Sequence, residues 1–302
     1  RDHTAVLLRT KDIFPGTRPD VRALLHILTG YCSRQYSFDN YRAPEKTCPP
    51  QRLIVEDPGA ELLSVLWNTQ GRVVDAVHRV KQLVSTPPNV LYPESMADMA
   101  LQLREFGLDV EVLDEKELER QGMGALLGVG QGSARPPRLV ILRWQGHSDP
   151  SCPPVVVAGK GITFDSGGLS IKTRPNMRGM KHDMAGAAVV FELLRCVAEN
   201  HLPINVVGLL ALAENMPSGH ALRPDDIVRT MSGKYVEIVS TDAEGRMVLC
   251  DALTYAVSRL SPACLIDIAP LTGAMSPALG SHQAGLFSQY ASPAASLLAA
   301  GA

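Results

Sequence analysis

Apolar residues recur at helical spacing in one part of the chain and form short runs in others, which predicts alternating helices and strands. Valines at helical spacing from Val73 to Val84 predict a helix that ends at Thr86-Pro-Pro88. Pro93 opens a second predicted helix, with Gly107 as its C-terminal cap. Beyond residue 107, short apolar runs alternate with further helical patterns.

The predicted elements after residue 107 fit one class of fold. The predicted strands are 108–113, 139–144, 155–158, 206–213, 235–239 and 265–268, and the predicted helices are 115–120, 183–198 and 246–260. Apolar strands that alternate with helices are typical of an α/β fold. We therefore expect a mixed, largely parallel sheet that helices cover on both faces.

The first sixty residues have a weaker pattern. They predict a helix over 21–28 and a short aromatic strand over 36–41. Several prolines between Pro44 and Pro58 then indicate a loop-rich join. We interpret residues 1–60 as the C-terminal remnant of a smaller N-terminal α/β domain plus a linker, and residues 61–302 as the main domain.

Composition and charge exclude some classes of function. The 302 residues are 45% apolar and 20% charged, and the net charge of −2 gives no reason to expect nucleic acid or a membrane as a partner. The longest apolar runs, such as 206–213, are shorter than the roughly 20 residues that a membrane span needs. The six cysteines form no C-x-x-C pair, which predicts reduced thiols and a cytoplasmic location.

Four carboxylates stand out in two charged segments, 157–186 and 240–246. They are Asp165, Asp183, Asp242 and Glu244, and both segments are predicted to follow strands at one edge of the sheet. Any one of these acids could be solvated, and Asp183 could cap the helix that follows it. Four together would repel one another unless positive charge lay between them. Two divalent cations would neutralise them, and oxygen donors suit magnesium, manganese or zinc.

Cations in the same segments have more than one interpretation. Lys160 could be a charged lysine paired with an aspartate, or a neutral amine that binds a metal. Lys172 and Arg246 are better placed to stay cationic and to meet negative charge that develops during a reaction.

Other catalytic or binding motifs have weak support. The chain has no H-E-x-x-H motif and no G-x-S-x-G nucleophile motif. The glycines of 128–132 suggest a dinucleotide-binding loop. However, Pro136 and Pro137 follow where a helix should open, so we interpret 128–132 as an ordinary loop.

The two charged segments together resemble the leucine (cytosol) aminopeptidase family of di-metal exopeptidases. The matching residues are Lys160-Gly-Ile-Thr-Phe-Asp165-Ser-Gly-Gly, Lys172, Met180-Lys-His-Asp183 and Thr241-Asp-Ala-Glu-Gly-Arg246. The likeness extends over about residues 21–286 and is greatest to the probable aminopeptidase-like animal branch of the family.

The resemblance implies an activity and a pair of metal sites. Such enzymes hydrolyse the N-terminal residue from peptides whose amino group is unblocked, with two divalent ions, Zn²⁺ or Mn²⁺ and in some cases Mg²⁺. By position, one ion is implied to bind four residues and the other three. These sets are Lys160, Asp165, Asp183 and Glu244 for one ion, and Asp165, Asp242 and Glu244 for the other.

The resemblance also implies roles for residues around the metals. A water between the ions would attack the peptide carbonyl, Lys172 would donate to the resulting oxyanion, and Arg246 would position a bicarbonate that serves as general base. Met180, Pro270 and Gly273 are implied to line the pocket for the substrate side chain.

Three positions depart from the family pattern. Pro270 replaces a threonine in the side-chain pocket, which removes a hydroxyl and a backbone donor. Ser240 stands where the family usually has asparagine. Asp225 replaces a glycine, which would strain the turn if this position needs a positive φ.

Length is the remaining departure. The family has a fuller N-terminal domain and further residues beyond 302, so we expect a chain truncated at both ends, with residues 61–302 an incomplete di-metal aminopeptidase catalytic domain. By resemblance, a complete chain would form a homo-hexamer. The alternatives are a catalytically silent truncated isoform or assembly subunit and, on residues 128–132 alone, a dinucleotide-binding module.

Overall fold

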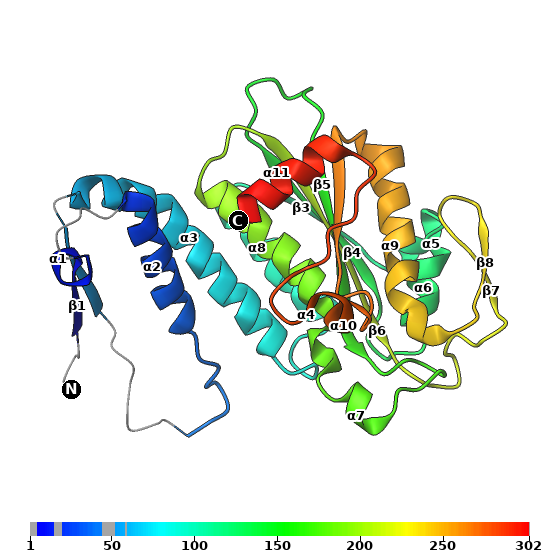
Figure 1. The fold of residues 1–302 in the computed structure, drawn as a ribbon. Coiled ribbons are helices and arrows are strands. Elements are labelled where there is room, and N and C mark those ends of the chain that lie inside the picture. Colours follow the sequence, from blue (N-terminus) through cyan, green and yellow to red (C-terminus); the bar gives the residue numbers. More distant parts are fainter. Residues whose placement is uncertain (1–4, 15–19, 44–51, 58, 302) are drawn as a thin grey trace. The chain divides into compact units, whose positions relative to one another are not determined.

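The structure is a computed structural model that describes residues 5–14, 20–43, 52–57 and 59–301 (Figure 1). The chain divides into two compact units, residues 1–269 and residues 270–302. The domain boundary expected after residue 60 stays a prediction.

A five-stranded sheet forms the centre of the first unit. In spatial order its strands are β3 (Asp109–Leu113), β4 (Arg138–Gln145), β6 (Asn205–Asn215), β5 (Val155–Asp165) and β9 (Cys264–Ile268). Strand β5 pairs in parallel with β6 and β9, whereas β4 pairs antiparallel with β6 and β3. Four strands therefore run in one direction and β4 runs against them, which confirms the predicted mixed α/β fold.

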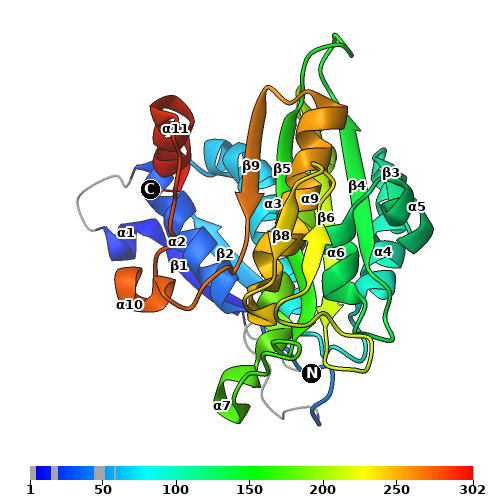
Figure 2. The same cartoon turned by 90° about the vertical axis from the view of Figure 1, so that its right-hand side faces the viewer.

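Helices cover both faces of this sheet, as Figures 1 and 2 show. One face packs against α3 (Ala60–Ser85), α4 (Pro93–Leu101) and α8 (Ala185–Glu199), and the other against α5 (Glu115–Arg120), α6 (Gly124–Gly130) and α9 (Glu244–Tyr255). Successive residues of a strand point to opposite faces. Leu139 and Ile141 of β4 accordingly join one core, and Val140 and Leu142 join the other.

Helix α3 begins at Ala60, earlier than its valine pattern predicts. Its buried residues include Val74 and Leu83, while Val73 and Val77 are each 40% exposed. The helix packs against α2 as well as α8, so the residues that it buries are not simply those in line with the valines. The prediction of a helix was right.

Other boundaries were easier to predict. Helix α4 continues into a 3-10 turn over Gln102–Phe106, and Gly107 ends it with a φ of 86°, as predicted. Helix α5 has the predicted bounds. Strands β5 and β6 are longer than predicted, because each continues past its apolar run into polar residues at the edge of the sheet.

Residues before α3 form a smaller layer. Strands β1 (Ala5–Arg9) and β2 (Arg52–Glu56) pair in parallel, with the short helix α1 (Thr10–Ile13) after β1. Helix α2 (Val21–Arg34) confirms the helix predicted at 21–28, and its Leu24 and Leu28 are buried together with Leu63 of α3.

The aromatic strand predicted over 36–41 is wrong. Residues 36–39 have no regular secondary structure, and a turn follows. Instead of alternating across a sheet, Tyr36 packs beside His78 of α3, with 5.8 Å between the ring centroids, and its hydroxyl donates to Gln82. Most of the proline-rich join lies outside the described residues.

Two further predictions are corrected by the fold. Strands β7 (Ile227–Arg229) and β8 (Tyr235–Glu237) form a separate antiparallel hairpin, so the strand predicted at 235–239 does not belong to the central sheet. Residues 128–130 are the end of helix α6 rather than a loop. Helix α6 packs on α9 and β6, which stabilises helical backbone despite its glycines.

Short helical segments complete the structure. They are α7 (Arg174–Met177), the 3-10 turns Met180–Met184 and Thr241–Ala243, and the π turn Ala256–Leu260. In the second unit, α10 (Met275–Leu279) and α11 (Ala291–Gly301) contain no buried residue. Of the cysteines that are described, all have free thiols. Within the described ranges, every helix is too short or too polar to cross a membrane.

Candidate metal centre

Strand β5 and the segment after it carry the first half of the site. Lys160 lies within β5, opposite Ala211 of β6, and not after the strand as predicted. Asp165 is the last residue of β5 and pairs with Asn215, the last residue of β6. The side chain of Lys160 has room because Gly245 is next to it, where a Cβ would lie 2.8 Å from the Lys160 Nζ.

Two 3-10 turns and the first residue of a helix supply the other acids. Asp183 lies in the 3-10 turn before α8, Asp242 in the 3-10 turn before α9, and Glu244 is the first residue of α9. The N-cap residue of α8 is Met184, so the interpretation of Asp183 as the helix cap is wrong.

Two lysines join these acids in pairs. The Lys160 Nζ lies 2.8 Å from Asp183 Oδ1 and 2.8 Å from Glu244 Oε1. The Lys172 Nζ lies 2.8 Å from Asp165 Oδ2 and also pairs with Asp242. The Lys160 group is buried, with only 2% of Lys160, 5% of Asp183 and 4% of Glu244 exposed. The structure thus brings together all four carboxylates that the sequence singled out.

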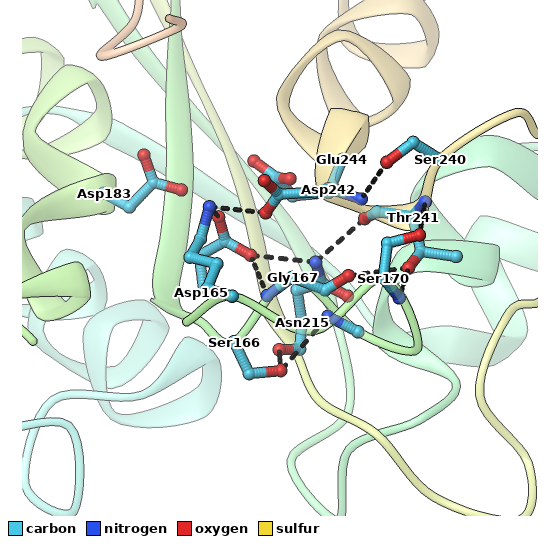
Figure 3. Close-up of polar contacts among 12 residues, drawn as sticks. Asp165, Ser166, Gly167, Ser170, Asp183, Asn215, Ser240, Thr241, Asp242 and Glu244 are labelled. Carbon is cyan, nitrogen blue, oxygen red and sulfur yellow. Dashed lines mark hydrogen bonds and ion pairs between the residues drawn. The ribbon is translucent and has the colours of Figure 1, made fainter. Parts of the chain in front are cut away.

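Three of the carboxylates lie close enough together to share a divalent cation. Asp165, Asp242 and Glu244 each offer one oxygen, and these oxygens lie within 4.8 Å of one another (Figure 3). Among the described residues, Asp183 Oδ2 and Glu244 Oε2 are buried without a hydrogen-bond partner. An unsatisfied buried carboxylate oxygen is costly, and hard divalent ions prefer such oxygen donors. Asp165, Asp242 and Glu244 therefore fit a divalent ion, and a second ion beside it stays a prediction.

Burial and charge shift the pKa values of the buried group. Burial raises the pKa of Asp183 to about 7, although the neighbouring Lys160 ammonium acts to lower it. Burial alone would lower the pKa of Lys160, but the charges of Glu244 and Asp183 raise it above its ordinary value. Lys160 therefore forms charged ion pairs here, and a role as a neutral ligand needs a divalent cation to displace its proton.

Lys172 is held as a cation by the outer pair of acids. Burial acts to lower its pKa, but the hydrogen bonds that it donates to Asp165 and Asp242 raise it well above the ordinary lysine value. Lys172 thus stays a cation, and its role in stabilising developing negative charge stays a prediction.

Comparison with known proteins assigns the chain to a family. Residues 78–302 match the catalytic domain of the cytosol aminopeptidase family. The chain belongs to the cytosol aminopeptidase family. The assignment to its animal branch stays a prediction.

Relatives of the family support the same assignment over most of the chain. A probable cytosol aminopeptidase from Rhizobium etli is 44% identical over 292 residues, which are 95% of this chain and 59% of the relative. Another, from Desulfovibrio desulfuricans, is 55% identical over 229 residues, or 75% of this chain and 45% of the relative. The chain thus spans less than two thirds of the length of these relatives.

Solved structures of similar proteins share the fold. The bottromycin maturation enzyme BotP in complex with Mn superposes with a TM-score of 0.85 at 36% identity, covering 98% of this chain and 63% of BotP. The leucyl aminopeptidase of Trypanosoma brucei in complex with actinonin gives a TM-score of 0.83 at 32% identity, covering 98% and 56% of the two chains.

In this family member, an amide that the sequence analysis missed supports Asp165. The Asn215 Nδ2 donates to Asp165 Oδ1 at 2.8 Å, and the Gly167 N–H donates to the same oxygen at 2.9 Å. The sequence signal for Asn215 is weak, because it is one polar residue after the apolar run of β6. Only the pairing of β5 with β6 places it beside Asp165.

The other departures from the family pattern have local explanations. The Ser240 Oγ accepts a hydrogen bond from the Asp242 N–H at 3.2 Å and caps the turn, a role that asparagine also performs. Asp225 has a φ of 72°, so this turn does need the left-handed backbone that glycine adopts more easily.

The remaining predicted site residues are more exposed or lie elsewhere in the chain. Arg246 is exposed in the first turn of α9, and Met180 is half-buried in the turn that carries Asp183. Pro270 and Gly273 belong to the second unit. That Met180, Pro270 and Gly273 together line a substrate pocket stays a prediction.

Proposed function

We propose that this chain is part of a metal-dependent aminopeptidase that removes the N-terminal residue from peptides with an unblocked amino group. The observation that carries the proposal is the convergence of Asp165, Asp242 and Glu244, together with the unpartnered buried oxygens of Asp183 and Glu244. Because the chain spans 59% of the length of its Rhizobium etli relative, the proposal concerns the whole protein.

Two divalent ions are proposed to bind among these residues. Asp165 and Glu244 would contact both ions, Asp183 and a neutral Lys160 would complete one site, and Asp242 would complete the other. Support comes from the carboxylate geometry and from the manganese bound by the similar BotP. Zn²⁺, Mn²⁺ and Mg²⁺ are all suited to sites rich in oxygen donors.

The chemistry of the reaction divides between the ions and the protein. When bound, two such ions lower the pKa of a water molecule and polarise the peptide carbonyl. Lys172, held as an ammonium by Asp165 and Asp242, would donate a hydrogen bond to the carbonyl oxygen as negative charge develops there. The four carboxylates are all used as ligands, so Arg246 is proposed to hold a bicarbonate that removes the proton from the water.

Substrate, assembly and location are also proposals. Met180, Pro270 and Gly273 would contact the side chain of the residue that is removed. The complete protein is proposed to be a cytoplasmic homo-hexamer that acts on peptides and binds neither nucleic acid nor membranes. The family name and the composition of the chain support these proposals.

A second candidate function is a catalytically silent isoform or assembly subunit. It is favoured by Pro270, which lacks the hydroxyl that the family pattern has in the side-chain pocket. In that case the metal centre would stabilise the fold without supporting turnover.

Peptide hydrolysis by the purified chain tests the two functions. With Mn²⁺ or Zn²⁺ added, we expect release of the first residue from leucyl dipeptides but not from their N-acetylated forms. A chelator or Glu244→Ala should reduce the rate at least ~100-fold, because Glu244 would contact both ions. The control Glu237→Ala, on strand β8 outside the site, should leave it unchanged. A folded chain that binds metal but releases no product would support the silent isoform instead.

A further inference from the structure

We propose that Thr241 is a positioning residue that fixes the separation of the two metal-binding segments and thereby sets the affinity for divalent ions. The inference rests on the proposed function, because it concerns the same site. It is carried by hydrogen bonds that join residues 165–172 to residues 240–244 (Figure 3). We call Ser170, Asn215 and Thr241 the Thr241 network.

The hydroxyl of Thr241 both donates and accepts a hydrogen bond in this network. It donates to the Gly167 carbonyl at 2.6 Å and accepts from the Ser170 N–H at 2.8 Å. The Thr241 N–H in turn donates to the Ser170 Oγ at 3.1 Å. The two segments are therefore joined by a reciprocal pair of hydrogen bonds between side chain and backbone, and Thr241 is only 4% exposed.

Asn215 connects the same two segments from strand β6. Its Nδ2 donates to Asp165 Oδ1 at 2.8 Å and to the Thr241 carbonyl at 3.0 Å. One amide group thus contacts a proposed ligand of the first segment and the backbone next to a proposed ligand of the second, Asp242. Because β6 is hydrogen-bonded on both sides within the sheet, this amide is a fixed point for both segments.

The segment after β5, which contains Gly168, also packs closely against the Thr241 network. Gly168 has a φ of 66°, and a Cβ there would lie 2.9 Å from Thr241 Oγ1 and 2.8 Å from Asn215 Oδ1. Those distances are shorter than normal van der Waals contact. A residue larger than glycine at position 168 would push the two segments apart. Glycine at this position therefore allows their close approach.

This arrangement matters because the groups that it holds repel one another. Asp165 lies two residues before Gly167, and Asp242 directly follows Thr241. Their carboxylates carry like charge, which the Lys172 ammonium paired with both of them offsets in part. The Thr241 network consists of uncharged groups, so it can hold the ligands near their binding distance before an ion arrives. Partners of this kind typically change metal affinity by about 10–100-fold.

Binding of Mn²⁺, measured by titration calorimetry on the whole chain, tests the inference. We expect Thr241→Val to weaken Mn²⁺ binding by about 10–100-fold, because both segments lose their shared hydroxyl. Thr241→Ser keeps the hydroxyl and should stay within about 3-fold of the wild type. The control is Thr230→Val. Thr230 is 5% exposed, and its hydroxyl donates to the Lys234 carbonyl in the hairpin before the site.

A milder variant keeps the inference open to refutation if Thr241→Val does not fold, and a double-mutant cycle adds a test of coupling if it does. Ser170→Ala removes the acceptor for the Thr241 N–H at a half-buried position. If the two residues act as one unit, the double variant should weaken Mn²⁺ binding by less than the product of the two single effects. Thermal unfolding without metal separates a general loss of stability, which Thr230→Val should share, from a loss of metal affinity.

Three results would count against the inference. It is wrong if both Thr241→Val and Ser170→Ala bind Mn²⁺ as the wild type does, or if Thr230→Val loses as much affinity as Thr241→Val. It is also wrong if Thr241→Ser fails to restore binding. A wild-type chain that binds no Mn²⁺ or Zn²⁺ would instead overturn the proposed function, and the inference with it.

Discussion

Two buried aspartates, Asp183 in the turn before α8 and Asp251 within α9, have opposite surroundings. Asp183 leaves one carboxylate oxygen without a hydrogen-bond partner among the described residues. Both oxygens of Asp251 are satisfied, since Oδ2 accepts from the N–H groups of Ala125 and Leu126 and Oδ1 accepts from Met231. Asp251 therefore stabilises the start of helix α6 from outside that helix, and only Asp183 has capacity for a ligand.

The structural role of Asp251 predicts a large effect on stability. Asp251→Ala would leave the buried N–H groups of Ala125 and Leu126 and the half-buried N–H of Met231 without this acceptor. We expect a loss of about 3 kcal/mol in the free energy of unfolding. Urea denaturation measures the loss. Asp98→Ala, at an exposed position of α4, should change the free energy by less than about 0.5 kcal/mol. Equal effects of the two substitutions would contradict this account.

At the scale of elements, an ion pair between half-buried Arg79 and buried Glu192 joins α3 to α8. The Arg79 Nε lies 2.6 Å from Glu192 Oε2, and a second guanidinium nitrogen of Arg79 lies 3.4 Å from Glu199. Burial raises the pKa of Glu192, although its hydrogen bond with Arg79 acts to lower it. The folded chain therefore binds a proton at Glu192 more tightly than the unfolded chain does.

This shift predicts how stability depends on pH. The pKa of Glu192 is higher in the folded state, so its contribution to the stability of the fold is greatest at low pH. This contribution falls as pH rises from about 4.5, the unfolded value, through the raised folded value. The stability of the wild type relative to Glu192→Gln should thus fall with rising pH, by at most about 1.4 kcal/mol per pH unit. Urea denaturation of both proteins at a series of pH values measures the difference.

A second glutamate, Glu117, provides a control because its pKa shifts in the opposite direction. The hydrogen bonds from Arg120 and Gln121 lower the pKa of Glu117 to about 2. Its contribution is therefore present above the unfolded value of about 4.5 and is lost as pH falls toward 2. Stability relative to Glu117→Gln should rise with pH. If both pairs change in the same direction, the assignment of these shifts to burial and to ion pairing is wrong.

At the scale of the whole molecule, the metal centre links segments that are distant in sequence. Its proposed ligands come from β5, from the turn before α8 and from the start of α9. An unfolded chain does not hold these segments together, so divalent ions should bind the folded state in preference.

Metal binding should therefore stabilise the chain against unfolding. At a free Mn²⁺ concentration of 100 times Kd, we expect a gain of about 2.7 kcal/mol for one occupied site. Thermal unfolding with and without Mn²⁺ measures it, and Glu237→Ala should keep the gain while Glu244→Ala loses most of it. An equal rise in Tm for both variants would place Mn²⁺ binding outside the proposed centre.

The predictions succeeded where local pattern decides structure. Helix α5 was predicted to the residue, because Asp114 accepts from the Glu117 N–H and marks its start. The strand expected at 235–239 has similar β-forming residues, but local pattern does not say which sheet a strand joins. Residues 36–41 failed for a related reason, since the aromatic ring of Tyr36 packs on α3 rather than in a strand.

The sequence by itself determined the α/β class and the residues with metal-binding chemistry, because strand and helix periodicity and the side-chain donors are properties of short segments. Tertiary structure decided which of these residues meet. Asn215 lies 50 residues from Asp165, and Thr241 lies 71 residues from Ser170. No local pattern encodes such contacts, since they arise only when β5 pairs with β6 and α9 packs on the sheet.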